Sequence, residues 1–151
     1  MKTELKTYTI EQITDGFVYS ELENKGLYGL SGELVIQPEF QRNYIYAKDN
    51  KDIKVIDSLL KGYPIGLIYF SNGLDDEGNE RLEVLDGQQR ITSIGRFITG
   101  KFAVIFEGRE QTFNSLPQDK KDLIMNYKIL VYVCKGTESE IKEWFKTINT
   151  E

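Results

Sequence analysis

The segment from Asp86 to Arg90, Asp-Gly-Gln-Gln-Arg, concentrates side chains that could do chemistry. It follows an apolar run that ends at Leu85, and apolar residues then return at helical spacing, which predicts a strand, a turn and a helix. A helix that begins at such a turn offers backbone N–H groups and the positive end of its dipole to an anion. Arg90 adds a planar guanidinium suited to phosphate oxygens, and Gly87 allows a ligand to approach the backbone closely. The segment therefore predicts a phosphate site.

The other side chains of this segment suggest further roles. Gln88 and Gln89 carry neutral amides that could bind a nucleotide or position a water. Asp86 could hold a metal ion, cap the helix or orient an arginine. The alternative is an Asp-Gly turn followed by a helix that Asp86 caps, and spacing alone favours the two interpretations about equally. The sequence contains no GxxxxGK[ST] loop of the Walker type.

A second amide–arginine pair, Gln41-Arg42, follows a predicted strand and Pro38. Taken alone, it is typical of an exposed loop with a surface arginine. Cys134 ends an apolar strand and has no histidine to activate it, so we expect a buried, unreactive thiol. The acidic run at 75–77 is more typical of a solvated turn than of a metal site.

The composition excludes several kinds of chemistry. The chain has no histidine, so it can form no Ser-His-Asp or Cys-His pair and no zinc site that uses histidine. Its 24 acidic and 19 basic residues give a net charge of −5, so any DNA binding needs a local patch or another domain. A single cysteine and the lack of a signal peptide favour a reducing cytoplasm. The apolar runs are too short to cross a membrane.

Helical and strand patterns alternate along the whole chain and predict an α+β (mixed α/β) fold, a mixed sheet with flanking helices. Capping boxes at Thr9 and Thr137, helical periodicity and a start signal at Ser115–Gln118 predict helices over 10–17, 50–61, 88–98, from 117 and from 138. Apolar and β-branched runs predict strands over 33–37, 65–70, 81–86, 101–106 and 127–134. The glycine-rich stretch 24–32 predicts a loop or a hairpin turn.

The last residues, "FKTINTE", leave a helix without a stop signal. We expect residues 1–151 to be a single domain at the N-terminal end of a longer protein. The alternative is a small protein that ends in a frayed helix.

Three stretches together favour a phosphate site over an ordinary turn at residues 86–90: "IQPEFQRNY", "IDSLLKGYPIGLIYF" and "EVLDGQQRITSIGRF". They resemble a bacterial and archaeal domain-of-unknown-function family marked by a QR motif and a DGQQR motif, within the ParB/sulfiredoxin superfamily. The resemblance runs from about Leu34 to the end of the chain. It implies a ParB-like fold in which a strand–turn–helix with a G-x-x-R core, here Gly87 and Arg90, binds nucleotide phosphates. The sulfiredoxin branch has a reactive cysteine in this loop, whereas this chain has Gln88 and Gln89.

In the relatives, the domain hydrolyses NTP within restriction and phage-defence enzymes, commonly beside an HNH-type nuclease domain that a chain without histidine cannot contain. The resemblance thus implies an NTPase that uses Mg²⁺ and gates DNA cleavage by a nuclease domain or partner. Asp86, Gln89 and Arg90 would be catalytic, with Asp86 on the metal. The nucleotide would contact Gln41, Arg42, Gly87, Gln88, Gln89 and Arg90. The alternatives are a module that senses nucleotide or modified DNA without turnover, and a ParB-like DNA-nicking domain.

Overall fold

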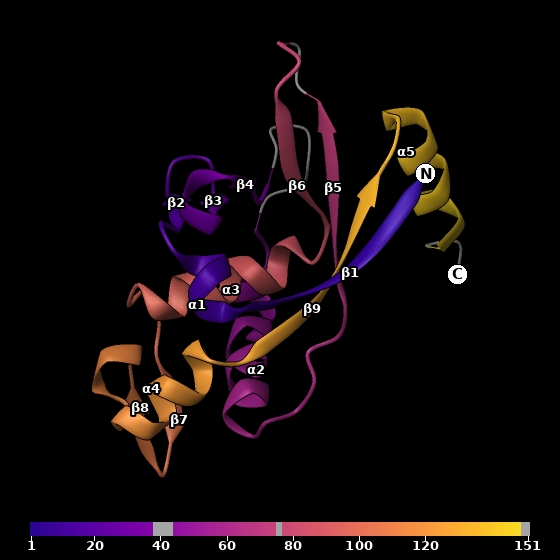
Figure 1. Ribbon diagram of the computed structural model, residues 1–151. Coiled ribbons are helices and arrows are strands. Elements are labelled where there is room, and N and C mark those ends of the chain that lie inside the picture. The colour runs from indigo at the N-terminus through magenta and orange to yellow at the C-terminus, as the bar shows by residue number, and fades with distance from the viewer. Residues whose placement is uncertain (38–43, 75–76, 149–151) are drawn as a thin grey trace.

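The computed structural model describes residues 1–37, 44–74 and 77–148, which form a large mixed sheet with helices against it (Figure 1). In spatial order its strands are β1 (Lys2–Thr9), β9 (Lys128–Lys135), β5 (Ile68–Leu74), β6 (Glu80–Asp86), β4 (Leu34–Val35), β3 (Lys25–Gly29) and β2 (Val18–Ser20). The helices are α1 (Ile10–Thr14), α2 (Lys51–Leu60), α3 (Gln88–Ile98), α4 (Gln118–Met125) and α5 (Glu138–Ile148). A separate hairpin joins β7 (Val104–Phe106) and β8 (Arg109–Gln111).

The sheet is mixed because it contains both antiparallel and parallel strand pairs. β5 and β6 form an antiparallel pair, as do β1 and β9, whereas β4 pairs parallel with β6 and β5 pairs parallel with β9. Helices separate the parallel partners in the chain, as parallel pairing requires a crossover. The predicted α+β class is confirmed.

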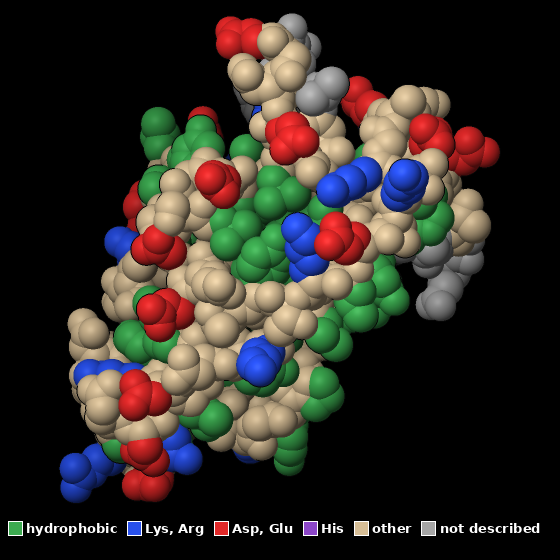
Figure 2. Space-filling view, viewed as in Figure 1, with side chains coloured by type: hydrophobic (Ala, Val, Ile, Leu, Met, Phe, Trp, Pro, Cys, Tyr) green, Lys and Arg blue, Asp and Glu red, His purple; other side chains and the backbone are tan. Residues whose placement is uncertain are grey.

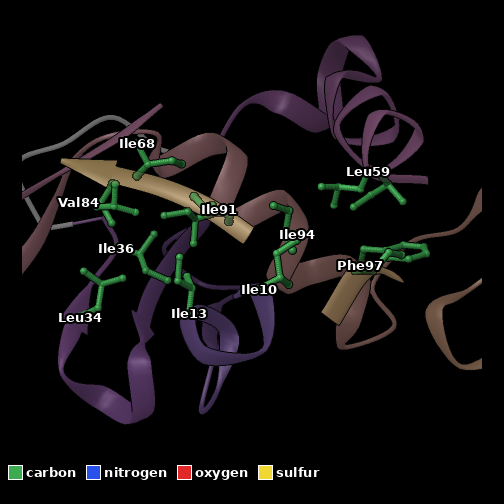
Figure 3. Close-up of a cluster of buried hydrophobic side chains, with 14 of the residues drawn as sticks. Ile10, Ile13, Leu34, Ile36, Leu59, Ile68, Val84, Ile91, Ile94 and Phe97 are labelled. Atoms are coloured by element: carbon green, nitrogen blue, oxygen red, sulfur yellow. The ribbon is translucent and has the colours of Figure 1, made fainter. Parts of the chain in front are cut away.

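The core lies between the sheet and α1, α2 and α3. Figure 3 shows Ile91, Ile94 and Phe97 of α3 among side chains from α1, α2 and the central strands. These three residues are at most 1% exposed and recur every three residues, so one stripe of α3 is buried as its periodicity predicts. Burial of this stripe fixes how α3 is rotated about its own axis, and with that the direction in which its polar residues point.

The opposite face of the sheet carries aromatic side chains and α5. Along β5, Ile68 and Phe70 are fully buried in the core, so Tyr69 between them points to the other face. Tyr69 stacks on Tyr132 of β9, with 5.8 Å between the ring centroids, and meets Trp144 of α5 edge-on at 5.6 Å. α5 therefore covers part of this second face.

The prediction of a loop or a hairpin turn over 24–32 holds only for the end of the stretch, because Lys25–Gly29 form strand β3. Its glycines allow close packing. A Cβ on Gly26 would lie 2.5 Å from Thr92 Oγ1 of α3, and one on Gly29 would lie 2.3 Å from the carbonyl oxygen of Ile13 in α1. Gly26 and Gly29 therefore mark sites where helices pack against the strand, whereas Gly32, at φ +92°, lies in the turn Leu30–Gly32 that reverses the chain between the antiparallel strands β3 and β4.

The other predicted elements differ mainly at their ends. α3 has the predicted bounds, α2 lies within the predicted range, and Thr9 and Thr137 form the predicted capping boxes. α1 ends at Thr14 instead of Phe17, and β5 begins at Ile68 and continues to Leu74. Ser115 does not cap α4, because its hydroxyl bonds within the preceding turn to Thr112. Strands β1, β2 and β8 were not predicted.

Within the described parts of the chain, no helix is long and apolar enough to cross a membrane.

Candidate functional site

The Asp86–Gly87 turn joins β6 directly to α3. β6 ends at Asp86, Gly87 is the N-cap of α3 at φ +110°, and the helix begins at Gln88. A side chain is excluded at Gly87 on two grounds. The positive φ is in the region that L-residues avoid, and a Cβ would lie 2.6 Å from Ile68 Cδ1. The predicted strand, tight turn and helix over 81–98 are confirmed.

The N-terminus of α3 has no side-chain cap, since its N-cap residue is glycine. In contrast, α1 and α5 begin with threonine hydroxyls that accept hydrogen bonds from the third helical N–H. The alternative in which Asp86 caps α3 is therefore wrong. An uncapped helix start favours an anion, because the backbone N–H groups and the dipole there are positive.

Arg90 lies across this turn. Its Nη1 donates a 2.7 Å hydrogen bond to the carbonyl oxygen of Ile65, and its Nη2 is 3.6 Å from the Asp86 carboxylate. A Cβ on Gly66 would lie 2.9 Å from Nη1, so the lack of a side chain at Gly66 makes room for the guanidinium. The Arg90 side chain is 20% exposed and that of Asp86 45%. The structure thus places a guanidinium, held in one orientation, and a solvent-accessible carboxylate at the start of α3.

The two glutamines hold the turn in place. Gln88 Nε2 donates to the carbonyl oxygens of Val84 and Leu85, at 3.0 and 3.1 Å, and so binds α3 to the end of β6. Gln89 is only 7% exposed, and its Oε1 accepts a 2.8 Å bond from the backbone N–H of Ile45. Gln89 therefore points toward the segment that follows the QR motif.

Gln41 and Arg42 lie in 38–43, outside the described residues, so the structure does not test their predicted approach to Arg90. The residues on both sides of this stretch are bonded to α3. Gln37 Oε1 accepts from Thr92 Oγ1 at 3.1 Å, and the Tyr44 hydroxyl lies 2.9 Å from Ser93 Oγ. α3 thus carries the Gln-Gln-Arg part of the DGQQR motif and bonds to the residues on both sides of the segment that contains the QR motif.

A buried polar stripe on α3 was missed by the sequence analysis. Gln89, Thr92 and Ser93 are at most 7% exposed, and Arg96 follows one turn later. The sequence signal for this stripe was the spacing of four between Gln89 and Ser93, which places both residues on one face of the helix, beside the apolar stripe.

Arg96 extends this stripe by packing between two aromatic rings. Its guanidinium carbon is 4.9 Å from the ring centroid of Tyr19 and 5.0 Å from that of Tyr44, and its Nη1 is 3.9 Å from Asp52 of α2. Burial raises the pKa of Tyr44, whose hydroxyl hydrogen-bonds with Ser93 Oγ. These contacts hold the residues just after the QR motif against α3.

The described residues contain no group of three or more Asp, Glu or Cys side chains that could by itself hold a metal ion. Asp86 is one carboxylate, and a magnesium ion bound there would take its other ligands from phosphate and water, as Mg²⁺ commonly does. Cys134 is fully buried, and burial raises the pKa of its thiol. This agrees with the predicted unreactive cysteine.

Fold and site together define an α+β domain in which a strand, a glycine turn and an uncapped helix carry an arginine and a carboxylate. Residues 20–151 match the model of the GmrSD restriction endonuclease N-terminal domain, and the chain belongs to this family. The predicted family and its restriction and phage-defence context are thereby confirmed. Comparison with curated proteins and with solved structures gives no match.

Proposed function

We propose that the chain binds and hydrolyses a nucleoside triphosphate with Mg²⁺, and that turnover gates DNA cleavage by a nuclease domain of the same restriction system. The observation that carries this proposal is the start of α3. There an uncapped helix N-terminus, the guanidinium of Arg90 and the exposed carboxylate of Asp86 lie together. The helix N-terminus and the guanidinium would bind phosphate oxygens, and a bound cation would account for the carboxylate beside them.

Each residue of the turn has a distinct proposed role. The first turn of α3 and Arg90 bind phosphate oxygens. The bond from Arg90 to Ile65 limits the movement of the guanidinium, so less conformational entropy is lost when phosphate binds. Asp86 is the proposed protein ligand of Mg²⁺, which would neutralise phosphate charge. Arg42 is proposed to reach the phosphates from the neighbouring segment.

Gln89 receives a positioning role in this proposal. Its burial and its bond to Ile45 support a function in holding the segment after the QR motif, rather than in orienting a water. Gln88 sets the geometry of the turn by its bonds to β6. Gly87 contributes because it has no side chain where Ile68 packs against the turn.

The Asp86→Asn variant tests this proposal in the full-length protein. It removes the negative charge and keeps the size of the side chain. We expect Mg²⁺-dependent phosphate release from ATP, GTP, CTP or UTP to fall at least tenfold. Binding of metal-free nucleotide should stay the same or strengthen, because a carboxylate beside the phosphates repels them. Phosphate release and calorimetric affinity, with and without Mg²⁺, measure both effects.

Asp119→Asn is the matched control, since Asp119 is an exposed aspartate in the first turn of α4. It should change neither quantity. Tight nucleotide binding without phosphate release in the unmodified protein would contradict hydrolysis and leave a nucleotide sensor.

A further inference from the structure

Strand β1 forms one edge of the large sheet (Figure 1). It pairs with β9 over all eight of its residues without a bulge, and no described strand lies on its other side. Residues 2–5 and Thr7 are exposed. Edges of this length are usually blunted by proline, bulges or short strands, because their unpaired N–H and C=O groups can pair with another chain. β1 has no proline and no bulge and is not short, but it carries Lys2, Glu4 and Lys6, and charged side chains discourage edge pairing unless the other edge complements them.

The sequence of β1 is complementary to itself in an antiparallel register centred on Leu5, whereas a register centred on Thr3 also places Lys2 opposite Glu4 but pairs only residues 2–4 of the strand. The N–H and C=O groups of a given residue point to the same side of a strand, and this side alternates along the strand. Two identical edges can therefore pair only in registers that place even-numbered residues opposite even-numbered ones and odd-numbered opposite odd-numbered ones. In the register centred on Leu5, Leu5 faces Leu5 and Glu4 faces Lys6 on both sides of the centre. Thr3 then faces Thr7.

The neighbouring registers are unfavourable by the same rule. Centring on Glu4 places Glu4 against Glu4 and Lys2 against Lys6, and centring on Lys6 places Lys6 against Lys6. Like charges directly opposite one another destabilise a strand pair, whereas opposite charges stabilise it. In Figure 2, acidic and basic side chains lie beside one another over the course that β1 takes in Figure 1.

The apolar residues near this edge fit the same arrangement. Leu5 is 52% exposed, and its partner across β9 is Tyr132 on the same face. Leu130 lies two residues further along β9 on that face and is 47% exposed. A two-fold axis at Leu5 brings the two leucines together and joins the apolar surfaces of both copies.

We propose that two copies of the chain associate through β1, antiparallel about Leu5, so that their sheets become one continuous sheet. β1 lies outside residues 20–151, the part that matches the family, so the interface belongs to the remaining part of this chain. The proposal concerns association alone and does not depend on nucleotide turnover.

Sedimentation equilibrium of the chain and its charge-reversal variants tests the pairing. The parent should form a species of twice 17.5 kDa. Glu4→Lys alone and Lys6→Glu alone should each raise the dissociation constant about tenfold or more, because both charge pairs become repulsive. A mixture of the two single variants should form a heterodimer, and the double variant should regain the affinity of the parent, since both restore Glu opposite Lys in the register centred on Leu5.

Two further variants identify the edge. Leu5→Lys places two ammonium groups at the two-fold axis and should yield monomers with the circular dichroism spectrum of the parent. Val18→Lys changes a residue that is 45% exposed on β2, the other edge strand, and should leave the dimer intact. A monomeric parent at 100 µM, or single charge reversals that dimerise like the parent, would overturn the proposal. A mixture that forms no heterodimer would also overturn it.

Discussion

Arg90 has two kinds of partner, and they predict different effects of its loss. The bond to the Ile65 carbonyl and the ion pair with Asp86 belong to the protein itself, whereas N–H groups of the guanidinium not used in these two contacts can donate to an anion. Because the guanidinium is charged, its bond to the Ile65 carbonyl and its bonds to a phosphate are all charge-assisted, a kind of bond that contributes about 1.5–3 kcal/mol. Loss of Arg90 should therefore reduce both the stability of the fold and the affinity for an anion.

Replacement of Arg90 by alanine separates these contributions. We expect Arg90→Ala to weaken nucleotide binding by about 1.5–3 kcal/mol and to lower the free energy of unfolding by a similar amount, because the bond lost to Ile65 is charge-assisted as well. Calorimetric titration and urea denaturation measure the two quantities. Arg109→Ala is the control, because Arg109 is an exposed arginine on β8. An intact variant with unchanged affinity would show that Arg90 is a structural residue only.

At the scale of elements, α3 organises the site through its two buried stripes. The apolar stripe packs against the sheet and α1, while the polar stripe bonds to Gln37, Tyr44 and Ile45. Both stripes depend on how closely β3 approaches the helix. That approach is possible because Gly26 has no side chain where Thr92 contacts the strand.

The packing of β3 on α3 predicts a large effect from one methyl group. Gly26→Ala should lower the free energy of unfolding by about 1–3 kcal/mol, because its Cβ would overlap Thr92 Oγ1. Gly73→Ala in β5 is the control, since nothing lies within 4 Å of that Cβ, and it should change stability by less than about 0.5 kcal/mol. Adding Thr92→Ala should recover part of the loss. Strictly additive effects in the double variant would argue against direct contact.

At the scale of the whole molecule, one contact joins residues far apart in the sequence. The amino group of Met1 donates a 2.7 Å hydrogen bond to the Glu140 carboxylate, which also accepts the backbone N–H of Thr137. These bonds, first that from Met1 and then those from Thr137, lower the pKa of Glu140 from 4.5 to about 2. This contact holds the start of β1 next to α5 (Figure 1).

The lowered pKa predicts a specific pH dependence of stability. The folded state keeps Glu140 ionised to lower pH than the unfolded state does, so its contribution is present above about pH 4.5 and is lost as the pH falls to about 2. The parent should therefore lose stability more steeply in this range than Glu140→Gln. Thermal unfolding midpoints of both proteins between pH 2 and 7 measure the difference, which should be constant above pH 5. Parallel curves throughout would contradict the assignment.

The sequence by itself determined the elements whose signals are local. A helix makes its hydrogen bonds within four residues, so periodicity and caps located α2, α3 and α5, and the Asp-Gly pair located the turn at Gly87. Two motifs were sufficient to predict the family, whereas the phosphate site indicated by the residue types at that turn stays a prediction.

Only the tertiary structure decided which partners the strands and polar side chains have. β1 alternates charged and neutral residues with little apolar signal and becomes a strand by pairing with β9, more than a hundred residues later. The glycines of β3 are explained by α3 and α1, which pack against the strand where a side chain would not fit. The direction of the Gln89 side chain follows from its hydrogen bond with the backbone of Ile45. Strand pairing and burial depend on residues distant in the chain, so no local pattern specifies them.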